Sequence, residues 1–207
     1  MGQITSFDLT NFINDFKCNV YFETGTGEGV SLEYVLKYPF EKLYSVDIDG
    51  DLISAAMDKF KNFNNIQLIH DYSSKALETY VPTIPMDSRI LFFLDAHFPG
   101  ADFHKITYEE SIRQFKKDAY PLEDEINIIK KSRNTSNDVI IVDDLKLYED
   151  GEFEHPNWEY KWLQDELNLN INSKFIYEAF RETHIFTKDY RHQGYLILTP
   201  KIINKSI

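Results

Sequence analysis

Cysteine, long apolar runs and positive charge are all scarce in this sequence of 207 residues. The single cysteine, Cys18, excludes an internal disulfide and suits a reducing compartment. No apolar run approaches the roughly 20 residues that span a bilayer, so we expect no membrane span. The first residues carry neither the basic nor the apolar region of a secretory signal. We therefore predict a cytoplasmic protein.

Basic residues are outnumbered, with 22 lysines and arginines against 34 aspartates and glutamates and a net charge of −12. Binding to nucleic acid depends largely on attraction to phosphates, which such a surface repels. We therefore expect no nucleic-acid partner, and the expected acceptor is a small molecule or a glycan.

Segments of strand and helix type alternate along the chain, and no repeat or linker divides it. Strands joined by helices pair in parallel through right-handed crossovers. The last segments, 175–180, 185–187 and 195–199, follow one another as predicted strands without a helix between them. We predict one α/β domain over residues 1–207, a doubly wound, seven-stranded, mostly parallel sheet that ends in an antiparallel hairpin. Other strand segments are predicted at 20–22, 43–46, 66–69, 90–94 and 139–142, which makes eight candidate segments for the seven strands. Helices are predicted at 30–38, 51–60, 73–80, 121–131 and 158–167.

Residues 98–120 form a long polar insertion between two of these strands. Insertions at this edge of a sheet commonly carry binding functions. A lid over the acceptor and a solvated excursion are the two interpretations of this segment.

The strongest motif is a glycine-rich turn over residues 22–29, Phe-Glu-Thr-Gly-Thr-Gly-Glu-Gly, between a predicted strand and a predicted helix. Glycines let the backbone turn sharply and let a ligand approach it, while the helix offers its N-terminus. Asp47 follows at the tip of the next strand, where a carboxylate can hold both ribose hydroxyls. A bare turn and the dinucleotide site of an NAD-dependent oxidoreductase are the alternatives. Glu23 argues against the latter, because a carboxylate repels a pyrophosphate and suits a cationic ligand.

These segments resemble the motifs of class I, Rossmann-like methyltransferases, which use S-adenosylmethionine. The likeness covers about residues 19–200 and includes residues 46–49 (Val-Asp-Ile-Asp) and 90–95. It implies that Glu23 and the glycines surround the methionine part, that Asp47 holds the ribose and that Asp71 contacts the adenine amino group. The predicted cofactor-binding residues are Glu23, Gly25, Thr26, Gly27, Gly29, Asp47, Ile48, Asp71, Tyr72 and Asp95.

Three carboxylates and an imidazole follow the predicted strands at 90–94 and 139–142. They belong to Asp95, His97, Asp143 and Asp144. Carboxylate oxygens suit Mg²⁺, and ligands of doubly wound sheets bind beyond the carboxyl ends of the strands. The arrangement resembles the metal-dependent O-methyltransferases of sugars and catechols, which implies that Asp95, Asp143 and Asp144 bind Mg²⁺ or Mn²⁺. In the sugar enzymes an aspartate two residues beyond the first ligand is the general base, and here that position holds His97. His97 and Asp95 are therefore the candidate catalytic residues, and helix capping or a metal-free cofactor pocket is the alternative role of the aspartates.

The sequence thus predicts S-adenosylmethionine-dependent O-methylation of a sugar or another small-molecule hydroxyl. Such an enzyme aligns donor and acceptor and removes one proton, for which a histidine is suited. Methylation of a nitrogen on a small molecule or a protein remains an alternative. So does a non-catalytic module that keeps the cofactor fold.

Overall fold

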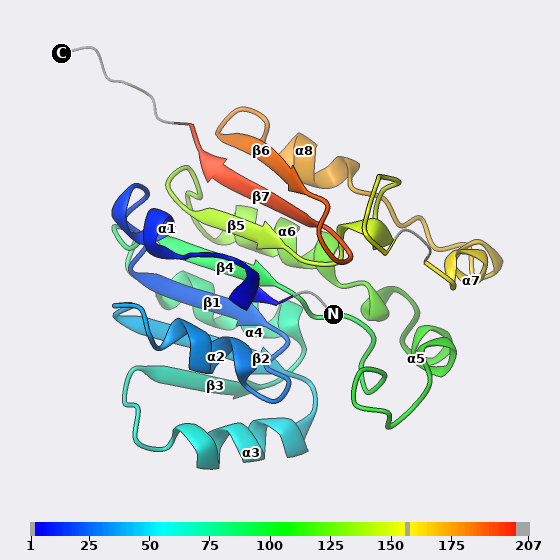
Figure 1. The fold of residues 1–207 in the computed structure, drawn as a ribbon, viewed down its shortest axis with the longest axis horizontal. Coiled ribbons are helices and arrows are strands. Elements are labelled where there is room, and N and C mark those ends of the chain that lie inside the picture. The colour runs from blue at the N-terminus through cyan, green and yellow to red at the C-terminus, as the bar shows by residue number, and fades with distance from the viewer. Residues whose placement is uncertain (1–2, 156–157, 202–207) are drawn as a thin grey trace.

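The computed structural model describes residues 3–155 and 158–201, so the predicted domain of residues 1–207 is described without 1–2, 156–157 and 202–207. Its centre is a seven-stranded sheet in the order β3-β2-β1-β4-β5-β7-β6 (Figure 1). Strands β1 to β5 are parallel, and β7 runs antiparallel to its neighbours β5 and β6. The predicted doubly wound sheet with a C-terminal antiparallel hairpin is confirmed. The strands are β1 (Val20–Thr24), β2 (Lys42–Asp47), β3 (Ile66–His70), β4 (Ile90–Leu94), β5 (Val139–Val142), β6 (His184–Asp189) and β7 (Tyr195–Pro200).

Helices cover both faces of the sheet. Side chains alternate along each strand, so Phe22 and Phe92 pack with α4, α6 and α8, whereas Tyr21, Leu91 and Phe93 pack with α1, α2 and α3. None of the helices in the described part of the chain is long and apolar enough to cross a membrane. The α-helices are α1 (Thr10–Asn14), α2 (Val30–Val35), α3 (Gly50–Phe60), α4 (Ser73–Tyr80), α5 (Tyr108–Phe115), α6 (Leu122–Ser132), α7 (Lys161–Glu166) and α8 (Lys174–Phe180), and short 3₁₀ turns lie at Ile4–Ser6, Val81–Thr83, Lys116–Ala119 and Leu145–Leu147.

One element near the end of the chain differs from the prediction. Residues 175–180, predicted as a strand, lie in helix α8. Its buried residues Ile176 and Phe180 are four positions apart, which is the spacing of one helical face. The strand was predicted because consecutive apolar residues begin at Phe175, a pattern that is also typical of a buried strand. Helix α8 therefore follows α7 between β5 and β6, and the hairpin consists of β6 and β7 alone.

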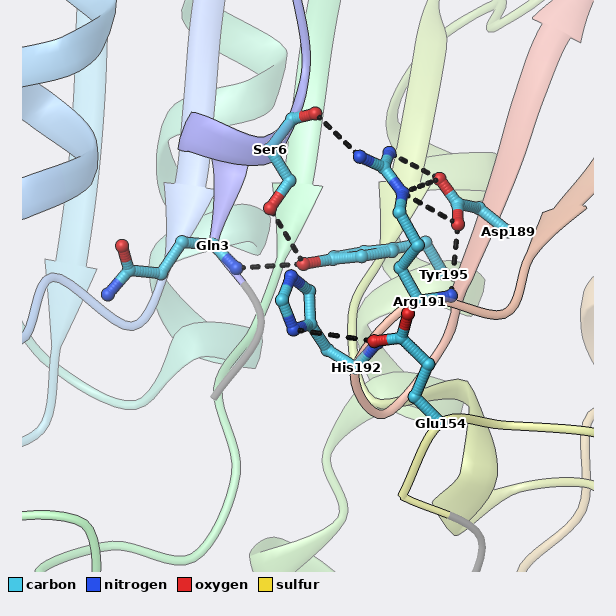
Figure 2. A network of polar contacts seen from close by, with 7 residues as sticks. All are labelled: Gln3, Ser6, Glu154, Asp189, Arg191, His192 and Tyr195. Carbon is cyan, nitrogen blue, oxygen red and sulfur yellow. Dashed lines mark hydrogen bonds and ion pairs between the residues drawn. The ribbon is translucent and has the colours of Figure 1, made fainter.

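The N-terminal segment is held against the β6–β7 hairpin by polar contacts (Figure 2). The backbone N–H of Gln3 donates to the Tyr195 hydroxyl at 2.9 Å, and the Arg191 guanidinium donates to the Ser6 carbonyl at 3.3 Å. These contacts join residues near the two ends of the described chain and hold the turn between β6 and β7 against the N-terminal segment. Gln193 in this turn lines the cleft described below.

Candidate active site

The carboxyl-terminal ends of β1, β2, β4 and β5 border one cleft, and the insertion after β4 forms its outer wall. Most of the predicted site residues line this cleft, namely Gly25, Gly27, Asp47, Ile48, Asp71, Tyr72, Asp95, His97 and Asp144. Glu23, Thr26, Gly29 and Asp143 are not part of its lining. The structure therefore brings the predicted cofactor-binding and catalytic residues together, with four of them set back from the cleft.

The glycine turn packs directly on two strand ends. Gly25 has a φ of +89°, in the left-handed region that favours glycine. A Cβ atom there would lie 2.6 Å from the carbonyl oxygen of Asp95 at the end of β4. The N–H groups of Gly25 and Thr26 also donate to the Val46 carbonyl of β2, at 2.8 and 3.1 Å. The turn therefore has no room for a side chain at Gly25.

Glu23, which precedes this turn in β1, is fully buried. Its carboxylate accepts hydrogen bonds from the Tyr21 hydroxyl at 2.8 Å and the Ser45 hydroxyl at 2.6 Å. Ser45 in turn contacts the Thr26 hydroxyl at 2.7 Å. Burial raises the pKa of Glu23 from 4.5 to about 7, although both hydrogen bonds act to lower it. Gly29 lies further along, at the N-terminus of α2 with a φ of +73°.

Asp47, at the end of β2, links the glycine turn to the turn that follows its own strand. One carboxylate oxygen accepts from the Gly27 N–H and the other from the Asp49 N–H, both at 2.9 Å. Burial raises the pKa of Asp47, against these hydrogen bonds. Asp71 lies beside Asp47, and its backbone N–H donates to the Asp47 carbonyl at 3.1 Å. The Asp71 carboxylate accepts a hydrogen bond from the Tyr72 N–H. The predicted ribose and adenine contacts are thus neighbours in space.

On the other side of the cleft, Asp95, His97 and Asp144 form a compact group. Each offers one ligand atom, and these three atoms all lie within 4.8 Å of one another. Burial, together with repulsion by Asp144, raises the pKa of Asp95 well above its usual range, and burial also raises the pKa of Asp144. Asp143 lies outside this group. It is fully buried, and it accepts a hydrogen bond from the Asp144 N–H at 2.7 Å.

His97 has one ring nitrogen engaged and one facing the carboxylates. Its side chain is 4% exposed, and Nε2 lies 2.9 Å from the Tyr148 hydroxyl. Nδ1 lies 3.9 Å from an oxygen of Asp95 and 3.9 Å from an oxygen of Asp144, and it has no hydrogen-bond partner among the described residues. Within the same residues, one oxygen of Asp144 is also buried without a partner. Two carboxylates and an imidazole nitrogen that converge in this way are a suitable donor set for a divalent cation.

The insertion contributes two residues that the sequence analysis did not single out, Phe98 and Phe103, which line the cleft. Tyr108 of the insertion also lines the cleft, and its hydroxyl donates to the Asp102 carboxylate. Tyr148, which contacts His97, was also missed. The aromatic residues at 98, 103 and 108 recur every five positions in an otherwise polar segment, and this regularity was the available signal.

No protein-family model and no curated protein matches the sequence. Solved structures do match the fold. A methyltransferase of Podospora anserina bound to S-adenosylhomocysteine has a TM-score of 0.58 and 13% identity, over 91% of this chain and 74% of that one. A candidate caffeoyl-CoA O-methyltransferase of Staphylococcus aureus has a TM-score of 0.61 and 10% identity, over 97% and 85%. The corresponding values for a candidate rRNA methylase of Clostridium thermocellum are 0.54 and 14%, over 89% of each chain.

The fold is that of the Rossmann-like methyltransferases. At 10 to 14% identity the likeness is one of architecture, and the three proteins are described by different acceptors or by none. The nature of the acceptor has to be argued from the cleft of this chain.

Proposed function

We propose that this protein transfers a methyl group from S-adenosylmethionine to a hydroxyl group of an uncharged small molecule, with a sugar as the preferred acceptor. The observation that carries the proposal is that the glycine turn and Asp47 line the same cleft as the group formed by Asp95, His97 and Asp144. One side of the cleft is suited to a nucleoside and the other to proton or cation chemistry.

The cofactor side fits S-adenosylmethionine in its shape and hydrogen-bonding groups. Gly25 and Gly27 line the cleft, and they present backbone rather than side chains to a ligand, with the Phe103 ring against Gly27. Each carboxylate oxygen of Asp47 accepts one backbone hydrogen bond and keeps a lone pair for a ribose hydroxyl. Asp71 lies next to it on the cleft wall, where it can accept from an adenine amino group. When bound, the cofactor supplies an electrophilic methyl group, and the protein has to align the acceptor with it.

The charge of the cleft supports an uncharged acceptor. Its lining includes the aspartates Asp47, Asp49, Asp71, Asp95, Asp102, Asp118, Asp124 and Asp144, and no lysine or arginine among the described residues. Such a lining attracts a cationic sulfonium and repels phosphates. Two of the structural neighbours are described by the acceptors caffeoyl-CoA and ribosomal RNA. Both acceptors carry phosphates, so this cleft is poorly suited to them. A neutral hydroxyl compound meets no such repulsion.

The group around His97 can assist the transfer in two ways, and both use Nδ1. As a general base, His97 accepts the proton that the hydroxyl loses. Alternatively, Asp95, His97 and Asp144 hold a divalent cation such as Mg²⁺ or Mn²⁺, which would lower the pKa of a hydroxyl bound to it. Asp143, which we predicted as a third carboxylate ligand, would then orient Asp144 through its backbone.

Calorimetry with S-adenosylhomocysteine tests the proposal at its first step. We expect micromolar affinity, about tenfold or more weaker binding by Asp47→Ala, and unchanged binding by the exposed control Asp58→Ala. A folded protein that does not bind at millimolar ligand would refute the cofactor assignment, and binding of NADH in its place would favour the oxidoreductase. Methyl transfer from labelled S-adenosylmethionine to a panel of neutral sugars, sugar phosphates and RNA tests the acceptor. Transfer to the phosphorylated compounds alone would refute the charge argument.

A further inference from the structure

The insertion after β4 begins with a segment, residues 99–107, that we call the strap. It leaves the sheet at the carboxyl-terminal edge and continues into α5 (Figure 1). Its base is closed by two hydrogen bonds, from the Phe98 N–H to the Ala119 carbonyl at 3.3 Å and from the Ser111 hydroxyl to the Pro99 carbonyl at 3.1 Å. The strap is therefore anchored where it starts, and its tip, residues 101–105, extends over the strand ends.

The tip contacts the glycine turn through Phe103. A Cβ atom on Gly27 would lie 3.1 Å from Cζ of the Phe103 ring, so the ring rests on the backbone of the turn. Phe103 also lines the cleft. An aromatic ring at this place covers the same backbone that the proposed cofactor has to approach.

A second contact joins the strap to the turn after β2. The Lys105 ammonium lies 2.5 Å from the Asp49 carboxylate and 3.0 Å from that of Asp51. Asp49 caps helix α3 and donates its own N–H to Asp47, the predicted ribose ligand. The strap thus starts at β4 and reaches both the glycine turn and the residues beside Asp47, so it lies across the cofactor side of the cleft.

From these contacts we infer that the strap is a cofactor-binding element, in which Phe103 covers bound S-adenosylmethionine and Lys105 latches the strap closed. The inference rests on the proposed function, and it differs from the lid over the acceptor that the sequence suggested. The side chains of Lys105 and Asp51 are 45% and 91% exposed, whereas that of Asp49 is 13% exposed. Ion pairs whose lysine remains in contact with solvent are weak and sensitive to salt. A latch of this kind opens readily, which a strap over an exchanging cofactor requires.

The dissociation rate of S-adenosylhomocysteine, measured by stopped flow on the full chain, tests this inference. We expect Phe103→Ala to raise the rate about tenfold, Phe103→Leu to raise it less, and Lys105→Ala to raise it about threefold. The control is Lys161→Ala, which removes a comparable surface ion pair, with Asp150 at 2.8 Å, outside the strap. Sodium chloride at about 0.5 M should accelerate release from the wild type and have little further effect on Lys105→Ala.

The outcomes separate this inference from the proposed function. If the wild type binds S-adenosylhomocysteine and the Phe103 and Lys105 variants release it at the wild-type rate, the strap is not part of the cofactor site. Lower melting temperatures with unchanged release rates would also refute the inference and leave the strap a packing element. If the wild type itself does not bind the ligand, it is the proposed function that fails.

Discussion

Glu23 gives the most direct test of the electrostatics of the glycine turn. The side chain is fully buried, and its only hydrogen-bond partners among the described residues are the hydroxyls of Tyr21 and Ser45. No lysine, arginine or histidine in the described part of the chain forms an ion pair with it, and burial raises the pKa of Glu23 from 4.5 to about 7. We predict that Glu23→Gln stabilises the protein at high pH.

The sign follows from proton binding. A folded-state pKa above that of the unfolded chain means that the folded protein keeps a proton that the unfolded chain releases, so stability falls as the pH rises from about 4.5 to about 7. Above pH 7 the cost is complete. At about 1.4 kcal/mol for each pKa unit, the rise from 4.5 to about 7 corresponds to roughly 3 kcal/mol. Glutamine carries no charge and avoids this cost.

Urea unfolding at pH 5 and pH 8 measures the effect. Subtracting the wild-type free energy of unfolding from that of Glu23→Gln gives the stabilisation by the substitution. This difference should be larger at pH 8 than at pH 5 by about 2 to 3 kcal/mol. The exposed residue Glu78 supplies the control, and Glu78→Gln should show almost no change between the two pH values. An equal difference for Glu23→Gln at both pH values would show that Glu23 does not titrate in this range.

Three further predictions follow from the geometry. Mn²⁺ titration monitored by electron paramagnetic resonance should show about tenfold or more weaker binding by His97→Ala than by Asp143→Asn; the reverse order would restore Asp143 as the ligand. Gly25→Ala should lower stability by about 2 kcal/mol, since its Cβ would lie 2.6 Å from the backbone oxygen of Asp95, and an unchanged melting temperature would contradict this. Arg133→Ala should cost about 3 to 5 kcal/mol in chemical unfolding, because Arg133 and Asp138 are each 1% exposed and their ion pair spans 2.9 Å; a cost below 1 kcal/mol would refute it.

The sheet and the position of the glycine turn at its edge were predictable because their signals are local. The strand, the glycines and the helix after them are read within residues 20–35, and the aspartate directly at the end of the next strand. The parallel sheet then brings Asp47 and Asp95 to one edge without further information. Helix α8 was missed at the same level, because its apolar residues are both consecutive and four apart, and the two patterns compete.

The pair Asp143 and Asp144 shows where sequence reasoning reaches its limit. The two residues are adjacent and chemically identical, yet Asp143 is fully buried and Asp144 lines the cleft. Asp144 has a φ of +52°, a left-handed conformation that ends β5 and redirects the chain. Such a turn is not encoded by residue type alone. The contacts of Phe103 and Lys105 are likewise non-local, since they join the strap to segments 54 to 76 residues earlier in the chain.

The acidity of the cleft and the ligands that we propose for it have one physical explanation. Burial raises the pKa of both Asp95 and Asp144, and repulsion by Asp144 raises the pKa of Asp95 further. A cation in the cleft acts in the opposite direction, because its attraction favours the ionised carboxylate. A sulfonium cofactor and a divalent metal are both cations, and either one binds the folded cleft but not an unfolded chain. Their binding therefore stabilises the fold. The cleft lining holds many partly buried carboxylates, so neutral substitutions among them should stabilise the free protein and weaken the binding of cationic ligands.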